Sequence, residues 1–210
     1  MNLGILETGG PPAQLAARFA SYGDMMRRML GPGFEATTYD VRAGRLPSDG
    51  AECDAWLITG SAAGVYDPEP WIADLKAFLQ DASGAAPMVG ICFGHQVMAD
   101  AFGGEVIKSP KGWGVGLHTY EIVAPQPWMD DDAPVALSVS HQDQVVTLPP
   151  GAQIVAASAF TPLAMLAYPE RRALSLQAHP EFEAAYTRAL IESRRAHAST
   201  RPSPMGRSLR

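Results

Sequence analysis

The sequence has little of what marks a secreted, metal-binding or membrane protein. Its 210 residues include two cysteines, Cys53 and Cys92, which stand far apart and in no metal-ligand spacing. Neither a disulfide framework nor a structural metal site is indicated, and the spacing favours a reducing compartment. Apolar runs are too short for a membrane span, and the first residues lack the basic segment of a signal peptide. We therefore expect a cytoplasmic protein with no membrane contact.

Basic residues are also few. Sixteen Lys and Arg stand against twenty-two Asp and Glu, and the net charge of −6 repels phosphate backbones. We expect no nucleic-acid partner and a small neutral or zwitterionic substrate. From Thr187 onward, however, six arginines face one acid, so a segment of +5 follows a body of −11. This segment is either a solvated last helix with a frayed end or a docking or lid element.

Length and hydrophobic content predict one domain. A chain of 210 residues that is 47% hydrophobic can bury one sizeable core but is short for two catalytic domains. The sequence shows no internal repeat and no linker. We expect a single domain over residues 1–198, followed by a basic, flexible tail over 199–210.

The first half of the chain alternates short apolar runs with amphipathic stretches, which predicts strands alternating with helices. Such alternation implies right-handed crossovers and a mostly parallel sheet that is covered on both faces. Strands are expected over 3–6, 34–41, 55–59 and 88–91, and helices over 15–26, 70–80 and 94–102.

The second half is rich in strand-like segments separated by turn residues, for which we expect antiparallel pairing. A last helix is expected from about 182 to 197. The predicted fold is therefore α/β, with a mostly parallel central sheet flanked by helices and an added antiparallel section. The added strands are expected over 112–123, 135–148, 153–157, 163–168 and 173–177.

The strongest motif lies where a buried strand is expected to end and a helix to begin. It reads Gly-Ile-Cys-Phe-Gly-His-Gln over residues 90–96. A nucleophile at such a turn is held in a strained backbone conformation, and small neighbours let the turn close while the sulfur stays exposed. The positive end of the following helix favours the thiolate and supplies N–H groups for an oxyanion. Cys92 is therefore the predicted nucleophile.

A thiolate nucleophile needs a base, and five histidines compete for this role. His179 is the predicted base, because His179-Pro180-Glu181 follows an apolar strand and residues two apart in an extended chain point the same way. Glu181 could then orient His179 in a Cys-His-Glu relay. His95 lies three residues from Cys92 but is expected to pack beneath the turn. His118 and His197 are expected to be structural or exposed.

These motifs resemble those of the class I, or triad, glutamine amidotransferases. The hallmark G-x-C-x-G-x-Q is matched in full over residues 90–96, and the His-x-Glu element is matched at 179–181. The resemblance implies a flavodoxin-like fold and extends along nearly the whole chain. It is shared by the glutaminase domain of GMP synthase and by stand-alone γ-glutamyl peptidases.

The resemblance also implies roles for residues outside the triad. The segments 58–61 and 64–67 look like the family's oxyanion loop, so the N–H groups of Gly60 and Phe93 are expected to hold the oxyanion. The stretch 138–143 resembles the one whose backbone holds the α-amino and carboxylate groups of glutamine. Gln96, Ser140 and His141 are therefore expected to bind substrate. The alternative, that the side chains of His141 and Asp143 only form a polar turn between strands, stays open. Trp113, in a segment common among stand-alone members, is expected in the core.

The implied reaction is hydrolysis of the γ-amide of glutamine, or of a γ-glutamyl compound, through a γ-glutamyl thioester on Cys92. No metal or cofactor is required, because His179 serves each proton transfer and backbone dipoles stabilise the charge. The chain has no G-x-x-x-x-G-K-[ST] phosphate loop, so any synthetase that receives the ammonia is a separate subunit.

Other functions stay open on the sequence alone. The protein could be a stand-alone γ-glutamyl peptidase or hydrolase with no ammonia acceptor, or a non-catalytic regulatory subunit of a synthetase. A degenerate subunit would usually have lost one of Cys92, His179 and Glu181, all of which are present. A chaperone- or protease-like cysteine-elbow protein commonly has His directly after the nucleophile, where this chain has Phe93.

Overall fold

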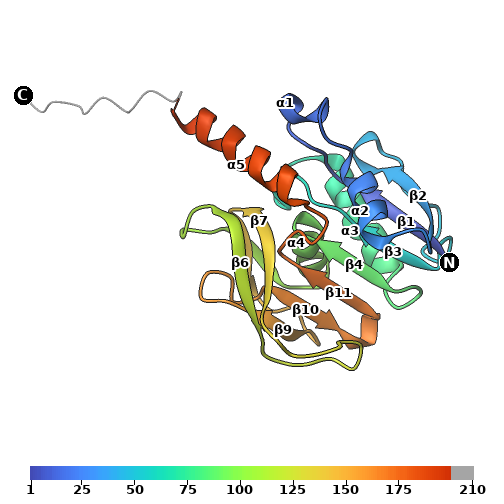
Figure 1. Cartoon of the computed structure of the whole chain (residues 1–210). Coiled ribbons are helices and arrows are strands. Elements are labelled where there is room, and N and C mark those ends of the chain that lie inside the picture. Colours follow the sequence, from blue (N-terminus) through green and yellow to red (C-terminus); the bar gives the residue numbers. More distant parts are fainter. Residues whose placement is uncertain (200–210) are drawn as a thin grey trace, which may run out of the picture.

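The computed structural model describes the backbone of residues 1–199 and the side chains of residues 1–195 (Figure 1). Within these residues, no helix is both long and apolar enough to cross a membrane. The tail predicted over 199–210 lies outside the described residues, apart from Ser199 at the end of the last helix.

A nine-stranded mixed sheet runs through both halves of the chain in the order β2-β1-β3-β4-β11-β10-β9-β6-β7. Its first five strands are parallel, and the remaining strands pair antiparallel. The predicted α/β fold, parallel first and antiparallel later, is confirmed. The strands are β1 (Asn2–Glu7), β2 (Glu35–Asp40), β3 (Ala55–Ile58), β4 (Met88–Ile91), β6 (Gly114–Ile122), β7 (Val135–His141), β9 (Gln153–Ala157), β10 (Met165–Tyr168) and β11 (Ala173–Leu176).

Helices lie on both faces of the parallel strands. One face packs on α3 and α4, and the opposite face packs on α2, beside which α5 lies (Figure 1). The strands between them are buried on both faces. In β3, Trp56 and Ile58 pack on the side of α3 and α4, while Leu57 packs on the side of α2. The helices are α1 (Ala13–Ala16), α2 (Tyr22–Leu30), α3 (Pro70–Asp81), α4 (Phe93–Ala101) and α5 (Ala184–Ser199), with single turns at Val41–Ala43 and Pro169–Arg171.

The helix predicted over 15–26 is two helices. Ser21 is extended, with φ −60° and ψ 162°, and its hydroxyl accepts a hydrogen bond of 3.1 Å from the N–H of Asp24. This is an N-cap, which starts α2 and separates it from α1. The apolar spacing continues across the break because residues of both helices pack together against α5.

The strand predicted over 135–148 is also divided. Its first part, β7, pairs with β6, whereas its second part is β8 (Asp143–Thr147), which pairs with β5 (Glu105–Lys108) in a separate two-stranded sheet. Gln142 is the residue between β7 and β8, where the chain passes from one sheet to the other. No strand was expected at β5, which is only four residues long and depends on β8 for its pairing.

Gly94→Ala tests the tight contact between α4 and β3. A Cβ at Gly94 would overlap the carbonyl oxygen of Ile58 and lie 3.0 Å from the carbonyl carbon. We expect the free energy of unfolding to fall by about 1–3 kcal/mol, because backbone cannot move aside as a side chain can. This loss should outweigh the gain in helix propensity, and urea unfolding measures it.

Gly33→Ala is the matched control, because no atom lies within 4 Å of a Cβ at that exposed turn. Its free energy of unfolding should stay within about 0.5 kcal/mol of the wild type. Equal stability of both variants would show that α4 does not lie against β3 as closely as described.

Candidate functional site

Sheet order brings three segments that are distant in sequence to one edge. Strand β4 lies between β3 and β11, and all three are parallel. Their carboxyl ends therefore meet, as ligand sites do in open α/β sheets. Gly60 follows β3, Cys92 follows β4 and His179 follows β11.

The backbone at Cys92 is strained. Its φ of 54° and ψ of −101° lie where L-residues rarely occur, and its N–H donates a 2.9 Å hydrogen bond to the carbonyl of Leu176. Gly90 and Gly94 permit this turn, since a Cβ at Gly90 would lie 2.6 Å from the carbonyl carbon of Gly94. Cys92 thus stands at the start of α4, but it is only 5% exposed, so the exposed sulfur that the motif predicts is not seen and Cys92 is reached through the pocket that it lines.

His179 is fixed on three sides. Its N–H donates to the carbonyl of Ser138 at 2.8 Å, and its Nδ1 lies 2.7 Å from Oε1 of Glu181. The ring of Phe182 stacks on the imidazole, with centroids 3.9 Å apart and planes 7° from parallel. Because Nδ1 bonds the carboxylate, Nε2 is the ring nitrogen left to exchange a proton with Cys92, whose side chain interacts electrostatically with this imidazole.

The electrostatics of this pair favour a charged imidazole. Burial alone would lower the pKa of His179, but the effects of the Glu181 carboxylate and the Cys92 side chain are larger. The pKa of His179 is therefore raised well above its ordinary value. Both His179 and Glu181 are 4% exposed, so water screens this interaction little. The arrangement therefore favours an imidazolium next to the Glu181 carboxyl group.

Gly60 lies against both side chains. A Cβ at Gly60 would be 2.9 Å from Cε1 of His179 and 3.7 Å from Cβ of Cys92. The buried hydroxyl of Thr8 donates to the carbonyl of Thr59 at 2.9 Å, and this oxygen belongs to the peptide that carries the Gly60 N–H, so the bond orients that peptide. In the described chain, neither the N–H of Gly60 nor that of Phe93 donates a hydrogen bond to another main-chain group. Both donors remain available beside the sulfur.

A pocket of about 450 Å³ opens in front of Cys92. Three predicted substrate residues line it: Gln96, Ser140 and His141. The buried Oγ of Ser140 and Nε2 of His141 have no hydrogen-bond partner among the described residues, so a ligand could use both. The remaining lining residues are Ser61, Ala62, Ala63, Gly64, Tyr66, Asp67, Lys108, Trp113, Gln142, Asp143 and Arg194.

Comparison with known proteins assigns the chain to a family. The sequence profile described as "Glutamine amidotransferase class-I" matches residues 28–194. The chain belongs to the class I glutamine amidotransferase family. A glutamine amidotransferase-like protein of Schizosaccharomyces pombe is 28% identical over 91% of this chain and 83% of its own length. "Gamma-glutamyl peptidase 4" of Arabidopsis thaliana is 28% identical over 85% of this chain and 75% of its own length.

Two further relatives extend this picture. GMP synthase of Syntrophomonas wolfei is 32% identical over 84% of this chain, which spans only 32% of that enzyme. The crystal structure of a glutamine amidotransferase from Thermotoga maritima superposes with a TM-score of 0.74 at 19% identity, covering 94% of this chain and 84% of the other. The fold of this amidotransferase chain is therefore the family's fold.

The polar wall of the pocket is held by hydrogen bonds among its own residues. Gln96 donates through Nε2 to the carbonyl of Asp143 at 2.9 Å and to Oε1 of Gln177 at 3.1 Å. The same Asp143 carbonyl lies 3.0 Å from Nδ1 of His141. Burial lowers the pKa of His141 to about 4, so this imidazole is neutral near pH 7.

The other histidines lie away from the proposed chemistry. His95 is fully buried, with Nδ1 2.8 Å from Oγ of Ser175, and burial lowers its pKa to about 3. It packs beneath the turn as expected. The ring of His118 meets Phe160 edge-on. The side chain of His197 lies outside the described residues.

Trp113 is not a core residue, contrary to expectation. It is 53% exposed and lines the pocket. An apolar aromatic next to a strand usually packs inward, but here the ring of Trp113 packs against the Arg194 guanidinium of α5.

Sequence reasoning missed Lys108 and Arg194, which also line the pocket. Arg194 belongs to the basic segment after Thr187, but no local signal marks Lys108, and each residue reaches the pocket only through the packing of its helix or strand.

Removing the charge of Glu181 should lower the pKa of His179. We compare Cys92→Ser with Cys92→Ser/Glu181→Gln, because the serine background removes the coupled thiol. Loss of the carboxylate should reduce the His179 pKa by about one to three. NMR titration of the imidazole Cε1–H signal measures this change.

His118 is the internal control, since its pKa is lowered by burial alone. Its titration should be the same in both variants. An unchanged His179 pKa would mean that Glu181 does not set the charge of the base.

Proposed function

We propose that this chain hydrolyses the γ-amide of glutamine or of a γ-glutamyl compound, with Cys92, His179 and Glu181 as its catalytic triad. The observation that carries the proposal is the convergence at one sheet edge of a strained Cys92, a His179 bonded to Glu181, and the Gly60 peptide. Family membership supports the same reaction class. The named relatives include a γ-glutamyl peptidase and GMP synthase.

The first half of the reaction forms a thioester. The Cys92 thiolate adds to the γ-carbonyl carbon, and the oxygen of the tetrahedral intermediate accepts hydrogen bonds from the N–H groups of Gly60 and Phe93. His179 donates its Nε2 proton to the leaving nitrogen as the C–N bond breaks. Ammonia or an amine leaves, and the γ-glutamyl group stays bound to sulfur.

The second half releases glutamate. Water attacks the thioester while His179 accepts its proton, and the tetrahedral intermediate expels the Cys92 thiolate. The bond between Nδ1 and Glu181 orients the imidazole and stabilises the imidazolium that forms in each half. The glutamyl end would use the pocket wall at Gln96, Ser140 and His141. His179 therefore serves the proton transfers of both halves.

The fate of the leaving group distinguishes two versions of this function. In one, ammonia passes to a separate synthetase subunit, in line with the similarity to one part of GMP synthase. In the other, an amine is simply released, in line with the similarity to a γ-glutamyl peptidase over 85% of this chain. Glutamate release in the absence of any partner favours the second version, and release only with an added synthetase favours the first.

Cys92→Ser should abolish the reaction. We expect kcat for glutamate release from glutamine and from a panel of γ-glutamyl peptides to fall at least about a thousandfold, because a hydroxyl is a far weaker nucleophile here. A glutamine-like electrophile should label Cys92 in the wild type, as mass spectrometry of the peptide would detect.

Cys53→Ser is the control, since Cys53 is buried in the core and does not line the pocket. It should keep both the activity and the labelling. If the wild type released no glutamate and took no label, the proposal would be refuted.

Gly60→Ala should impair catalysis while the fold persists. A Cβ 2.9 Å from Cε1 of His179 must displace the imidazole, and a misplacement of this kind costs about 100-fold in kcat. Gly10→Ala, whose Cβ meets no atom within 4 Å, should retain the wild-type rate. Steady-state kinetics and circular dichroism check both variants. Equal rates would place Gly60 outside the site.

A further inference from the structure

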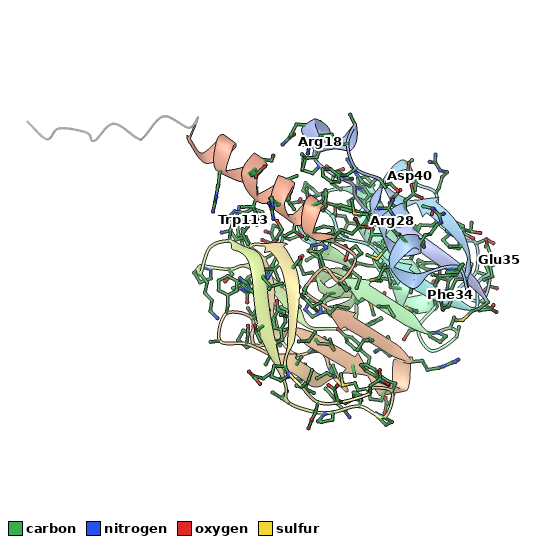
Figure 2. The ribbon with its side chains drawn as sticks, viewed as in Figure 1. Arg18, Arg28, Phe34, Glu35, Asp40 and Trp113 are labelled. Atoms are coloured by element: carbon green, nitrogen blue, oxygen red, sulfur yellow. The ribbon has the colours of Figure 1, made fainter. Side chains whose placement is uncertain are left out.

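Arg194 of helix α5 reaches the pocket in which Cys92 lies. Its side chain lines this pocket, and its Cζ lies 3.9 Å from the centroid of the Trp113 ring. Figure 2 shows Trp113 directly beneath α5, where the helix passes the ends of β6 and β7. Two segments that are far apart in sequence thus form one wall of the pocket.

The Arg194 guanidinium forms no ion pair with a carboxylate within the described part of the chain, and the nearby groups that favour its charge are Tyr22, Cys92 and Tyr186. No ion pair there includes it, and its buried Nε has no hydrogen-bond acceptor. Burial lowers the pKa of Arg194 somewhat, but an arginine stays charged at any physiological pH. A half-buried cation without a partner is costly to the protein, so a bound anion would relieve it.

The acids in the pocket are already engaged elsewhere. Asp67 accepts the N–H of Gly64 at 2.8 Å, and Asp143 accepts the hydroxyl of Tyr66 at 2.8 Å. The Tyr66 bond ties the loop after β3 to the start of β8. Lys108 adds a second cation to the lining. The lining thus carries two cations and two carboxylates, and no ion pair joins Arg194 to either carboxylate, so the guanidinium can accept an anion.

Stacking leaves the guanidinium ready to bind a carboxylate. The Arg194 Cζ lies over the Trp113 ring, 3.9 Å from its centroid, and the N–H groups of a guanidinium lie in its own plane. A planar fork of this kind matches the two oxygens of a carboxylate. Trp113 acts as a positioning residue, because it restricts the rotamers of the arginine.

We propose that Arg194, positioned by Trp113, binds a carboxylate on the amine half of the substrate and so selects γ-glutamyl amino acids and peptides over neutral γ-glutamyl amides. This inference rests on the proposed function. The glutamyl half is assigned there to Gln96, Ser140 and His141, which leaves the α5 wall for the leaving group. A pocket of about 450 Å³ exceeds what glutamine alone would fill.

The test compares γ-glutamylglycine with γ-glutamylglycinamide, which differ only in the carboxylate. The wild type should hydrolyse the acid with a kcat/KM about 10- to 100-fold higher, as expected for a bidentate charged pair. In Arg194→Met this ratio should fall to about one, and in Arg194→Lys it should be intermediate, because a lysine keeps the charge but not the fork.

Two controls separate this role from a structural one. Arg195→Met removes the neighbouring exposed arginine, which faces a different groove, and should keep the wild-type ratio. Trp113→Leu should lower the ratio, while Trp113→Phe should largely restore it by keeping an aromatic face. Thermal unfolding of each variant confirms that the fold is intact.

Calorimetric measurement of affinity tests the role of Arg194 independently of catalysis. Cys92→Ser should bind the acid more tightly than the amide, and Cys92→Ser/Arg194→Met should bind both equally. Absence of turnover with both compounds would refute the catalytic proposal, yet these affinities would still test Arg194. A wild-type ratio near one, or an equal loss for both compounds in Arg194→Met, would overturn the inference.

Discussion

The positive φ of Cys92 is the constraint on which the rest of the site depends. A side chain in this backbone conformation costs about 1–3 kcal/mol, and the neighbouring structure must compensate. The compensation is visible in the hydrogen bond from Cys92 to Leu176 and in the glycines at 90 and 94, which let α4 approach β3 and β4. Any side chain at Gly94 would push the helix away from the sheet and move the sulfur with it.

The same sheet edge decides which groups the sulfur meets. Because β4 lies between β3 and β11, the segments that follow these two strands flank Cys92, and Gly60 and His179 meet beside it. His179 is further tied to β7 through Ser138 and stacked on Phe182, which belongs to the cluster that α2 and α5 share. The antiparallel section and the last helix thus hold the imidazole, although the cysteine belongs to the parallel section.

The net negative charge of the chain does not describe the charge inside the pocket. The body of the chain is acidic, yet the pocket holds Lys108 and Arg194, and its two acids are bonded within the loops. The basic segment that begins near the end of the chain is therefore partly a pocket wall, since Arg194 belongs to it. Electrostatic selection of a substrate is local, because charges beyond about 10 Å are screened in physiological salt.

The sequence by itself determined the fold class and the position of the Cys92 turn, because apolar periodicity and glycines at a strand end are short-range signals. It also suggested His179 with Glu181, two residues apart in extended chain. Only the tertiary structure decided where α1 ends and α2 begins, how 135–148 divides between two sheets, and that Trp113 faces the pocket. Each of these features depends on contacts between segments that are distant in sequence, and a local sequence pattern does not predict such contacts.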